Sequence, residues 1–353
     1  MVDLADQLDA EPEVRLVPST YRTLFGRHPT GVWRAPGTVV PLADADAALA
    51  VGVRWGAIAA ASPREDGVLE LRSMSHPAES VTVDSLAVGS VPSWAVSPLA
   101  VVGALRAAGH PIGGASILLS VDVPAGAGMG PEAAAGCAVG LAMRDLWAPV
   151  LTDAELLAVG YRSLGGAGDP TVEAGRWAGA LLGREGTAVR VIGARPELVP
   201  LDLSAAGLRL VVVDTGLTSE SGRPASRLPA GSAESRLAAG DMRPAEPEAG
   251  GVRWAELAVG GLAALGPLMS VVPAWDGDPP RAALIQAALA AGALGARPVW
   301  DPIGAPALLL VAVDRLVAVR RAATEAALRA GGPQPRYLTV VPAAGGGRAG
   351  SAS

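Results

Sequence analysis

The chain has 353 residues, of which 50% are hydrophobic and 18% charged, and its formal net charge is −6. This length favours two lobes around a cleft. The net negative charge argues against a nucleic-acid partner, which requires a basic face. The acidic N-terminus lacks a basic segment followed by an apolar one, and no uninterrupted apolar run reaches about 20 residues. We therefore expect a cytoplasmic protein with neither a secretory signal nor a membrane partner.

The composition also restricts the chemistry. All 28 basic residues are arginine, and the sequence contains neither lysine nor asparagine. A phosphate-loop lysine and a lysine Schiff base are thereby excluded. Aromatic residues make up only 3% of the chain, so the core must be built from Ala, Val and Leu. The single cysteine, Cys137, rules out an intramolecular disulfide and is consistent with a reducing compartment.

The first half of the chain contains two predicted helices and one predicted strand. Apolar residues at helical spacing predict a helix over Pro98–Ala108, and the continuous apolar run Ser116–Val121 predicts a buried strand. A second helix is predicted over Thr152–Val159, because its Thr-Asp-x-Glu start suits an N-cap and an acidic first turn.

The second half repeats this mixture. Leu208–Val213 and Leu308–Val313 are predicted strands, and Leu316–Ala330 is a predicted amphipathic helix. Residues 219–251 are rich in Gly, Pro, Ser and charge, which predicts a mobile loop, and residues 343–353 are predicted to form a disordered tail. Because helices and strands mix without strict alternation, the sequence favours an α+β fold.

Metal-binding patterns are weak. His28, His76 and His110 each precede a proline, and with one cysteine they give no zinc-ligand spacing. Asp276 and Asp278 flank a glycine, but the rest of a calcium loop is missing. We predict no metal site from these residues.

Four stretches, taken in order, carry a resemblance to a known family. They are Tyr21–Gly37 (YRTLFGRHPTGVWRAPG), Ala108–Gly130 (AGHPIGGASILLSVDVPAGAGMG), Val199–Leu217 (VPLDLSAAGLRLVVVDTGL) and Gly292–Val313 (GALGARPVWDPIGAPALLLVAV). Over roughly residues 20 to 345 this order is similar to that of galactokinases, a branch of the GHMP kinase superfamily. The resemblance implies the GHMP kinase fold, with a ribosomal protein S5 domain 2-like N-terminal lobe and a ferredoxin-like C-terminal lobe around a central cleft.

The resemblance also implies a division of the chain. Residues 1–20 would be an N-terminal extension and residues 21–198 the N-terminal lobe. Residues 199–342 would be the C-terminal lobe, containing the mobile loop 219–251, and residues 343–353 the disordered tail.

The family's first motif is altered. The family has an arginine, which helps to stabilise transferred phosphoryl charge, followed by Glu, His and Asp for sugar hydroxyls. Here the arginine position falls on Thr38, and the sugar-binding segment reads Asp44, Ala45, Asp46, Ala47. Losing most of these convergent hydrogen bonds removes the basis for hexose selectivity. In an extended segment Asp44 and Asp46 would share a face and could hold Mg²⁺ or a hydroxylated ligand; as loop residues they would be solvated carboxylates.

The family's phosphate loop, in which backbone N–H groups and serine hydroxyls hold the nucleotide, is also altered. The corresponding residues are Pro124, Gly126, Gly128, Met129, Gly130 and Glu132. Pro131 lacks an N–H but is well tolerated in the first turn of a helix, where that N–H would have no intrahelical partner. Glu132 places a carboxylate where phosphates would sit, at a cost on the order of 1–4 kcal/mol unless a metal intervenes. The loop is therefore interpreted as a relic that keeps inherited geometry as a turn into a helix.

The family's catalytic aspartate has no counterpart. Alignment on Pro170 and Thr171 places its position at Gly175, or at Arg176 with one gap, and neither residue is a base. Glu173 lies two residues away, and rescue by it would require a shifted backbone because a base must reach within about 3 Å. We assign no catalytic residue.

Two further motifs of the family lie in the C-terminal half. Asp214 and Thr215 keep the family's D-T and are candidate ligand-binding residues, but Pro224 replaces a sugar-contacting tyrosine. The C-terminal glycine motif has become Pro298–Ala305 (PVWDPIGA), in which Trp300 and Pro302 are expected to fill the cleft.

The sequence therefore predicts a galactokinase-like protein that is catalytically degenerate, with a binding, regulatory or scaffold role toward an unknown protein or small-molecule ligand. The alternative is an active ATP-dependent kinase of a sugar or another small alcohol with a rebuilt site, which would require ATP and magnesium. Phosphoryl transfer depends mainly on positioning and charge neutralisation, so an enzyme that has lost only the base can retain some activity. Retaining activity is much harder when the base, the arginine and the loop serines are all lost.

Overall fold

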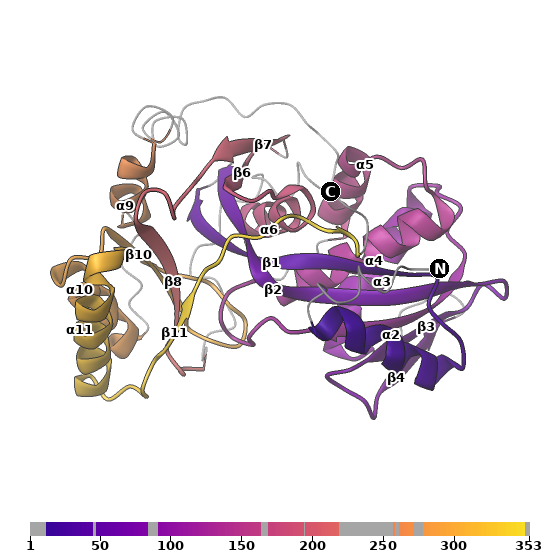
Figure 1. Cartoon of the computed structure of the whole chain (residues 1–353), viewed down its shortest axis with the longest axis horizontal. Helices are drawn as coiled ribbons and strands as arrows, with labels where there is room; N and C mark the ends of the chain where they lie inside the picture. The colour runs from indigo at the N-terminus through magenta and orange to yellow at the C-terminus, as the bar shows by residue number, and fades with distance from the viewer. Residues whose placement is uncertain are drawn as a thin grey trace.

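The computed structural model describes residues 12–44, 47–83, 91–163, 169–193, 195–218, 257, 261–270 and 278–349. These residues form two lobes, each with its own sheet and covering helices (Figure 1). The predicted loop 219–251 lies outside the described residues.

The first lobe is built on an eight-stranded sheet in the order β12-β1-β2-β5-β3-β4, with β6 pairing to β2 and β7 to β6. The strands are β1 (Gly31–Ala43), β2 (Ala47–Arg64), β3 (Leu69–Ser73), β4 (Ser80–Val83), β5 (Gly114–Val121), β6 (Thr187–Ile192), β7 (Arg195–Pro200) and β12 (Gly347–Arg348). The helices are α2 (Pro12–Phe25), α3 (Ser93–Ala107), α4 (Pro131–Trp147), α5 (Asp153–Arg162) and α6 (Pro170–Leu182). Only β3 and β5 pair in parallel among the described strands of this sheet.

The second lobe has a four-stranded antiparallel sheet in the order β11-β8-β10-β9. Its strands are β8 (Leu208–Asp214), β9 (Gly295–Pro298), β10 (Ala307–Ala312) and β11 (Arg336–Thr339). Its helices are α9 (Leu262–Ser270), α10 (Pro279–Ala290), the short 3-10 turn η1 (Val313–Arg315) and α11 (Leu316–Arg329).

Small residues bring α6 very close to the first sheet. A Cβ added to Gly175 would lie 2.9 Å from the Cβ of Ala48, and one added to Gly179 would lie 2.8 Å from Cγ2 of Thr38. The core here contains mostly Ala, Val and Leu, as the composition predicts. Close packing of this kind fixes the height of α6 above the strands, and with it the position of every side chain on the helix.

Most predicted elements are confirmed with shifted ends. Strand β5 extends the predicted run to Gly114, and β8 and β10 correspond to the other two predicted strands, except that Val313 belongs to η1. Helix α5 begins as predicted, because the Thr152 hydroxyl accepts the Glu155 N–H and the Glu155 carboxylate accepts the Thr152 N–H. The α+β fold is thus present in both lobes.

The predicted disorder of the tail is wrong for residues 343–349. Strand β12 pairs with β1, the Gly345 N–H donates to the Gly183 carbonyl, and the Arg348 guanidinium lies 5.5 Å from the centre of the Trp33 ring. Glycine-rich composition suggested disorder, but glycine also permits the close backbone approach seen here: a Cβ added to Gly346 would lie 2.7 Å from Leu141. Residues 350–353 lie outside the described part.

Truncation after Pro342 is therefore expected to lower the free energy of unfolding by about 2 kcal/mol or more, because it removes several backbone hydrogen bonds and uncovers Trp33. Urea denaturation followed by circular dichroism measures this loss. The control is Arg348→Ala, which keeps the backbone of the tail and removes side-chain contacts, among them the cation–π contact with Trp33 and the hydrogen bond to the Thr30 carbonyl. It should cost about 1 kcal/mol or less. An unchanged denaturation midpoint in the truncated chain would contradict the assignment of residues 343–349 to the fold.

Within the described residues, no helix combines the length and apolar character needed to cross a bilayer.

Candidate functional site

The glycine loop, residues 124–130, connects β5 to α4. Gly126, Gly128 and Gly130 have φ angles of 73°, 69° and 61°, a region that strongly favours glycine. Loops of this kind present backbone N–H groups at a helix N-terminus, where anions bind. Pro131 occupies the start of α4 without difficulty, as expected. The Met129 side chain is fully buried in the core, so the loop offers its backbone rather than this side chain to the site.

Arg176, and not Gly175, faces the glycine loop. Its Nη2 donates to the carbonyl oxygens of Gly128 at 3.1 Å and Trp300 at 3.2 Å, and its Nη1 forms a salt bridge with Glu173. Gly175 packs toward the sheet instead. Arg176 is only 2% exposed. Arg176, one of the two residues on which the family's base position was expected to fall, is thus a buried cation that bridges three parts of the fold.

Glu173 is held by this arginine. Burial raises the pKa of Glu173, the Arg176 charge opposes that rise, and Glu132 contributes to it by repulsion. Its carboxylate lies on α6 and points to the Arg176 guanidinium rather than into an open space. A guanidinium cannot accept a proton, so Arg176 cannot act as a general base. The Glu173 carboxylate is paired with the Arg176 charge in a salt bridge.

Thr38, the residue expected at the position of the family's arginine, is fully buried. Its N–H donates to the Met129 carbonyl at 2.8 Å, and its hydroxyl donates to the Arg176 carbonyl at 3.4 Å. The residue ties β1 to the glycine loop and to α6, and it brings no positive charge to a phosphoryl group.

The segment between β9 and β10, residues 299–306, closes directly over the glycine loop. Gly126 and Gly304 are in backbone contact, since a Cβ added to Gly126 would lie 3.4 Å from the Gly304 Cα. A Cβ added to Gly128 would lie 2.6 Å from the Val299 side chain. We expect Trp300 and Pro302 to prevent a close approach of the two backbones. The segment nevertheless has a glycine, Gly304, at the point where its backbone contacts the glycine loop.

The residue that sequence reasoning missed is Asp301. Its Oδ2 accepts the Gly128 N–H at 2.9 Å, and its Oδ1 accepts the N–H groups of Ile303 at 2.8 Å and Gly304 at 2.9 Å. The available signal was Asp-Pro-x-Gly, which is typical of a turn in which a carboxylate accepts backbone N–H groups. The contact with Gly128 joins residues 173 positions apart, and no local pattern predicts it.

Asp44 closes the β1–β2 hairpin by accepting the Ala47 N–H at 2.9 Å. Asp46 lies outside the described residues. Asp169 caps α6 by accepting the Thr171 and Val172 N–H groups; burial raises its pKa, Asp44 adds to the rise, and Arg297 opposes it. In the described part of the chain, no group of three or more His, Cys, Asp or Glu side chains could hold a metal ion.

Asp214 and Thr215 end strand β8 with intramolecular partners. The Asp214 carboxylate binds the Arg336 guanidinium, and the Thr215 hydroxyl donates to the Ala305 carbonyl at 2.9 Å. Thr215 therefore anchors the 299–306 segment to the second sheet. The structure brings together Thr38, the glycine loop, Arg176 and Asp301; Asp214 faces Arg336 instead.

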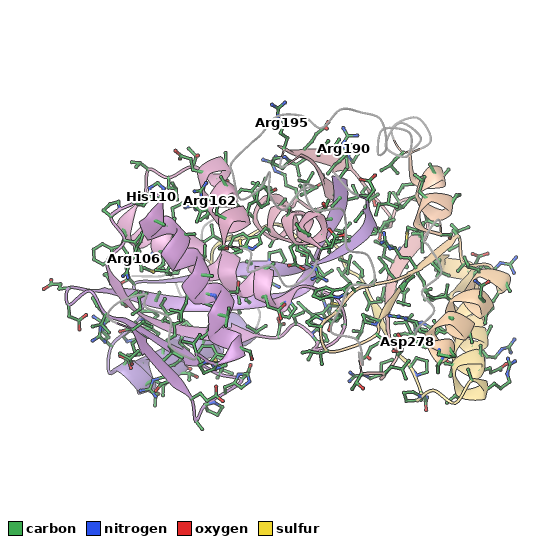
Figure 2. All side chains as sticks on the ribbon, turned by 180° about the vertical axis from the view of Figure 1, so that it is seen from behind. Arg106, His110, Arg162, Arg190, Arg195 and Asp278 are labelled. Carbon is green, nitrogen blue, oxygen red and sulfur yellow. The ribbon has the colours of Figure 1, made fainter. Side chains whose placement is uncertain are left out.

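Nucleotide phosphates do not fit this arrangement. One N–H of the glycine loop already binds a carboxylate, the buried Arg176 binds the Gly128 carbonyl, and the 299–306 segment contacts the loop at Gly126 and Gly128. The six residues labelled in Figure 2 lie elsewhere. Arg106, His110 and Arg162 lie on the first lobe near α3 and α5, Arg190 and Arg195 on the β6–β7 hairpin, and Asp278 beside α10 of the second lobe.

Comparison with known proteins gives a consistent result. Residues 97–173 match the GHMP kinases N terminal domain. A galactokinase from Streptomyces coelicolor is 31% identical over 382 residues, which cover 94% of this chain and 97% of that protein. A second galactokinase, from Streptomyces lividans, is 37% identical over 45% of this chain and 41% of its own length.

Solved structures agree at the level of the fold. The structure of Lactococcus lactis galactokinase complexed with galactose matches with a TM-score of 0.74 and 18% identity, over 95% of this chain and 100% of that one. A homoserine kinase from Cytophaga hutchinsonii matches with a TM-score of 0.59 and 16% identity, over 90% and 96%. With this fold, this set of motifs and a full-length relative above 30% identity, the chain belongs to the galactokinase family of GHMP kinases.

Proposed function

We propose that this galactokinase-like chain is a catalytically degenerate member of its family with a binding, regulatory or scaffold role. The observation that carries the proposal is Arg176, a buried cation paired with Glu173 and hydrogen-bonded to the glycine loop. At the place where the family has its base, the chain offers a group that is always protonated. Thr38, buried and neutral, supplies no charge for a transferred phosphoryl group.

The proposed localisation is cytoplasmic, and the proposed partner is a protein or a small-molecule ligand. The fold by itself assigns no activity, because functions differ among proteins that share a fold.

The test is phosphoryl transfer by the purified full chain with ATP, magnesium and galactose. Loss of a general base alone costs about 10²–10⁴-fold, so we expect sugar-dependent ADP release at least about 10³-fold below that of the Streptomyces coelicolor galactokinase assayed in parallel. That relative serves as the positive control. ADP release at a rate of about 1 s⁻¹ or more, which is ordinary for kinases, would refute the proposal.

The alternative is an active ATP-dependent kinase of a sugar or another small alcohol with a rebuilt active site. Glu173 is the candidate base in such a site, and the raised pKa of Glu173 is the one observation in favour of that role. Glu173→Gln separates the two. If a residual sugar-dependent rate is present and falls in this variant, the rebuilt-kinase function is supported; a rate that does not respond to the substitution excludes Glu173 as the base.

A further inference from the structure

Three backbone N–H groups converge on the carboxylate of Asp301. One oxygen accepts from Gly128 in the glycine loop, and the other accepts from Ile303 and Gly304 in its own segment, all within 2.9 Å. The residue is only 6% exposed. Among the described side chains no arginine forms a salt bridge with this carboxylate, so its charge is stabilised by backbone N–H groups, as a bound anion is stabilised in such loops.

The surrounding contacts hold Asp301 in place. Thr215 binds the carbonyl of Ala305, and Arg176 binds the carbonyl of Trp300, so the segment is fixed on both sides of Asp301. Arg176 also binds the carbonyl of Gly128, the residue whose N–H binds Asp301. One residue of the glycine loop, Gly128, is thus held at its carbonyl by a cation from α6 and at its N–H by an anion from the 299–306 segment.

The segment covers the glycine loop at the Gly128 N–H, to which the Asp301 carboxylate is bound. The Val299 side chain is in van der Waals contact with Gly128, and the Gly304 backbone is in contact with Gly126. A phosphate oxygen could take the Gly128 N–H only after the Asp301 carboxylate had withdrawn and the segment had moved. For a ligand that requires this rearrangement, the apparent Kd is the intrinsic Kd divided by the fraction of molecules in which the loop is already open. Such a ligand therefore binds more weakly than it would bind an open loop.

We infer that Asp301 is a built-in occupant of the glycine loop, an autoinhibitory contact that closes the loop to phosphate-bearing ligands. The inference deepens the proposed function and rests on it, because it explains why a chain with the family's loop would not bind a nucleotide. The carboxylate replaces the ligand's oxyanion, and the Arg176 bridge keeps the two lobes joined at that point.

Asp301→Asn tests the contact with minimal disturbance. The asparagine Oδ1 can still accept from Ile303 and Gly304, while its amide N–H₂ faces the Gly128 N–H, so that only the contact between the two segments is lost. The matched control is Asp278→Asn, which removes a carboxylate paired with Arg281 beside α10 in the second lobe (Figure 2).

Two measurements on the full chain read out the contact. In calorimetric titrations with inorganic pyrophosphate and with magnesium-ADP, we expect Asp301→Asn to bind at least about tenfold more tightly than the wild type and the Asp278→Asn control. In hydrogen exchange followed by mass spectrometry, the peptide covering residues 124–130 should be protected in the wild type and should exchange at least about tenfold faster in Asp301→Asn.

The inference is overturned if the wild type binds pyrophosphate or magnesium-ADP as tightly as Asp301→Asn. It is also overturned if the glycine-loop peptide exchanges rapidly in the wild type, a result that needs no variant to fold. These outcomes are separate from failure of the proposed function. Sugar-dependent phosphoryl transfer by the wild type refutes the proposed function, whereas nucleotide binding without transfer refutes only the role of Asp301.

Discussion

Replacing Arg176 with methionine is expected to lower the free energy of unfolding by about 3–5 kcal/mol, because the substitution leaves a buried carboxylate without its counter-charge. The Arg176 and Glu173 side chains are 3% and 14% exposed. The variant also leaves the carbonyl groups of Gly128 and Trp300 without the donors they have in the wild type. Urea denaturation monitored by circular dichroism gives the difference directly.

The pH dependence distinguishes the ion pair from simple packing. Burial raises the pKa of Glu173 and Arg176 opposes the rise, so the pKa must rise further once the arginine is gone. A native-state pKa above the unfolded value means that the native state binds more protons, and stability increases as the pH falls through that window. The deficit of Arg176→Met should therefore shrink between about pH 7 and pH 5.

The control is the double variant Arg176→Met with Glu173→Gln, in which residue 173 no longer carries a carboxylate. We expect it to be more stable than Arg176→Met at pH 7 and to lack the additional pH dependence. A double variant as unstable as the single one, with the same pH profile, would mean that the loss comes from packing and not from the unpaired charge.

The next residue of α6, Trp177, is expected to give an effect of similar size. Trp177→Ala should lower the free energy of unfolding by about 3–5 kcal/mol, because a large aromatic side chain leaves a cavity that the surroundings fill only in part. Trp177 is 1% exposed, and its indole packs directly against Gly136 of α4 and Gly160 of α5, where an added Cβ would collide with the ring. Differential scanning calorimetry and urea denaturation both measure the loss.

Trp177→Phe serves as the matched variant, since it keeps an aromatic ring and removes less volume; its cost should be clearly smaller than that of Trp177→Ala. Gly160→Ala makes the complementary change and should be destabilising by about 1–3 kcal/mol through overpacking. Equal stability of Trp177→Ala and the wild type would contradict the packing of α6 against α4 and α5.

The elements predicted from the sequence are those with strong local signals. The capping residues Thr152 and Glu155 mark the start of α5, and the runs of Val and Leu in β8 and β10 mark buried strands. Strand β2 was not predicted, because its many alanines have low strand propensity and its extended form depends on pairing with β1, β5 and β6. Tertiary contacts determine the secondary structure of such a segment.

For the candidate site, too, the sequence predicted local features but not the contacts between distant segments. The glycine loop lies in a stretch that resembles the family, and Thr38 directly follows another, so short motifs identify both. Counting from Pro170 and Thr171 narrowed the family's base position to Gly175 or Arg176. Their joint geometry could not be identified. The salt bridge of Arg176 is local, but its bonds to Gly128 and Trp300 span 48 and 124 residues, and a sequence pattern holds no information on pairs so far apart.

Strand β12 has a consequence for how the protein is made. The first strand of the large sheet, β1, pairs on one side with a strand that the ribosome synthesises more than 300 residues later, since Trp33 pairs with Arg348. During synthesis the edge of β1 stays open until residue 348 has emerged, and an open edge is a template for pairing with another chain. The first lobe should therefore complete its sheet only after residue 348 has left the ribosome, and nascent chains of intermediate length should depend most on chaperones.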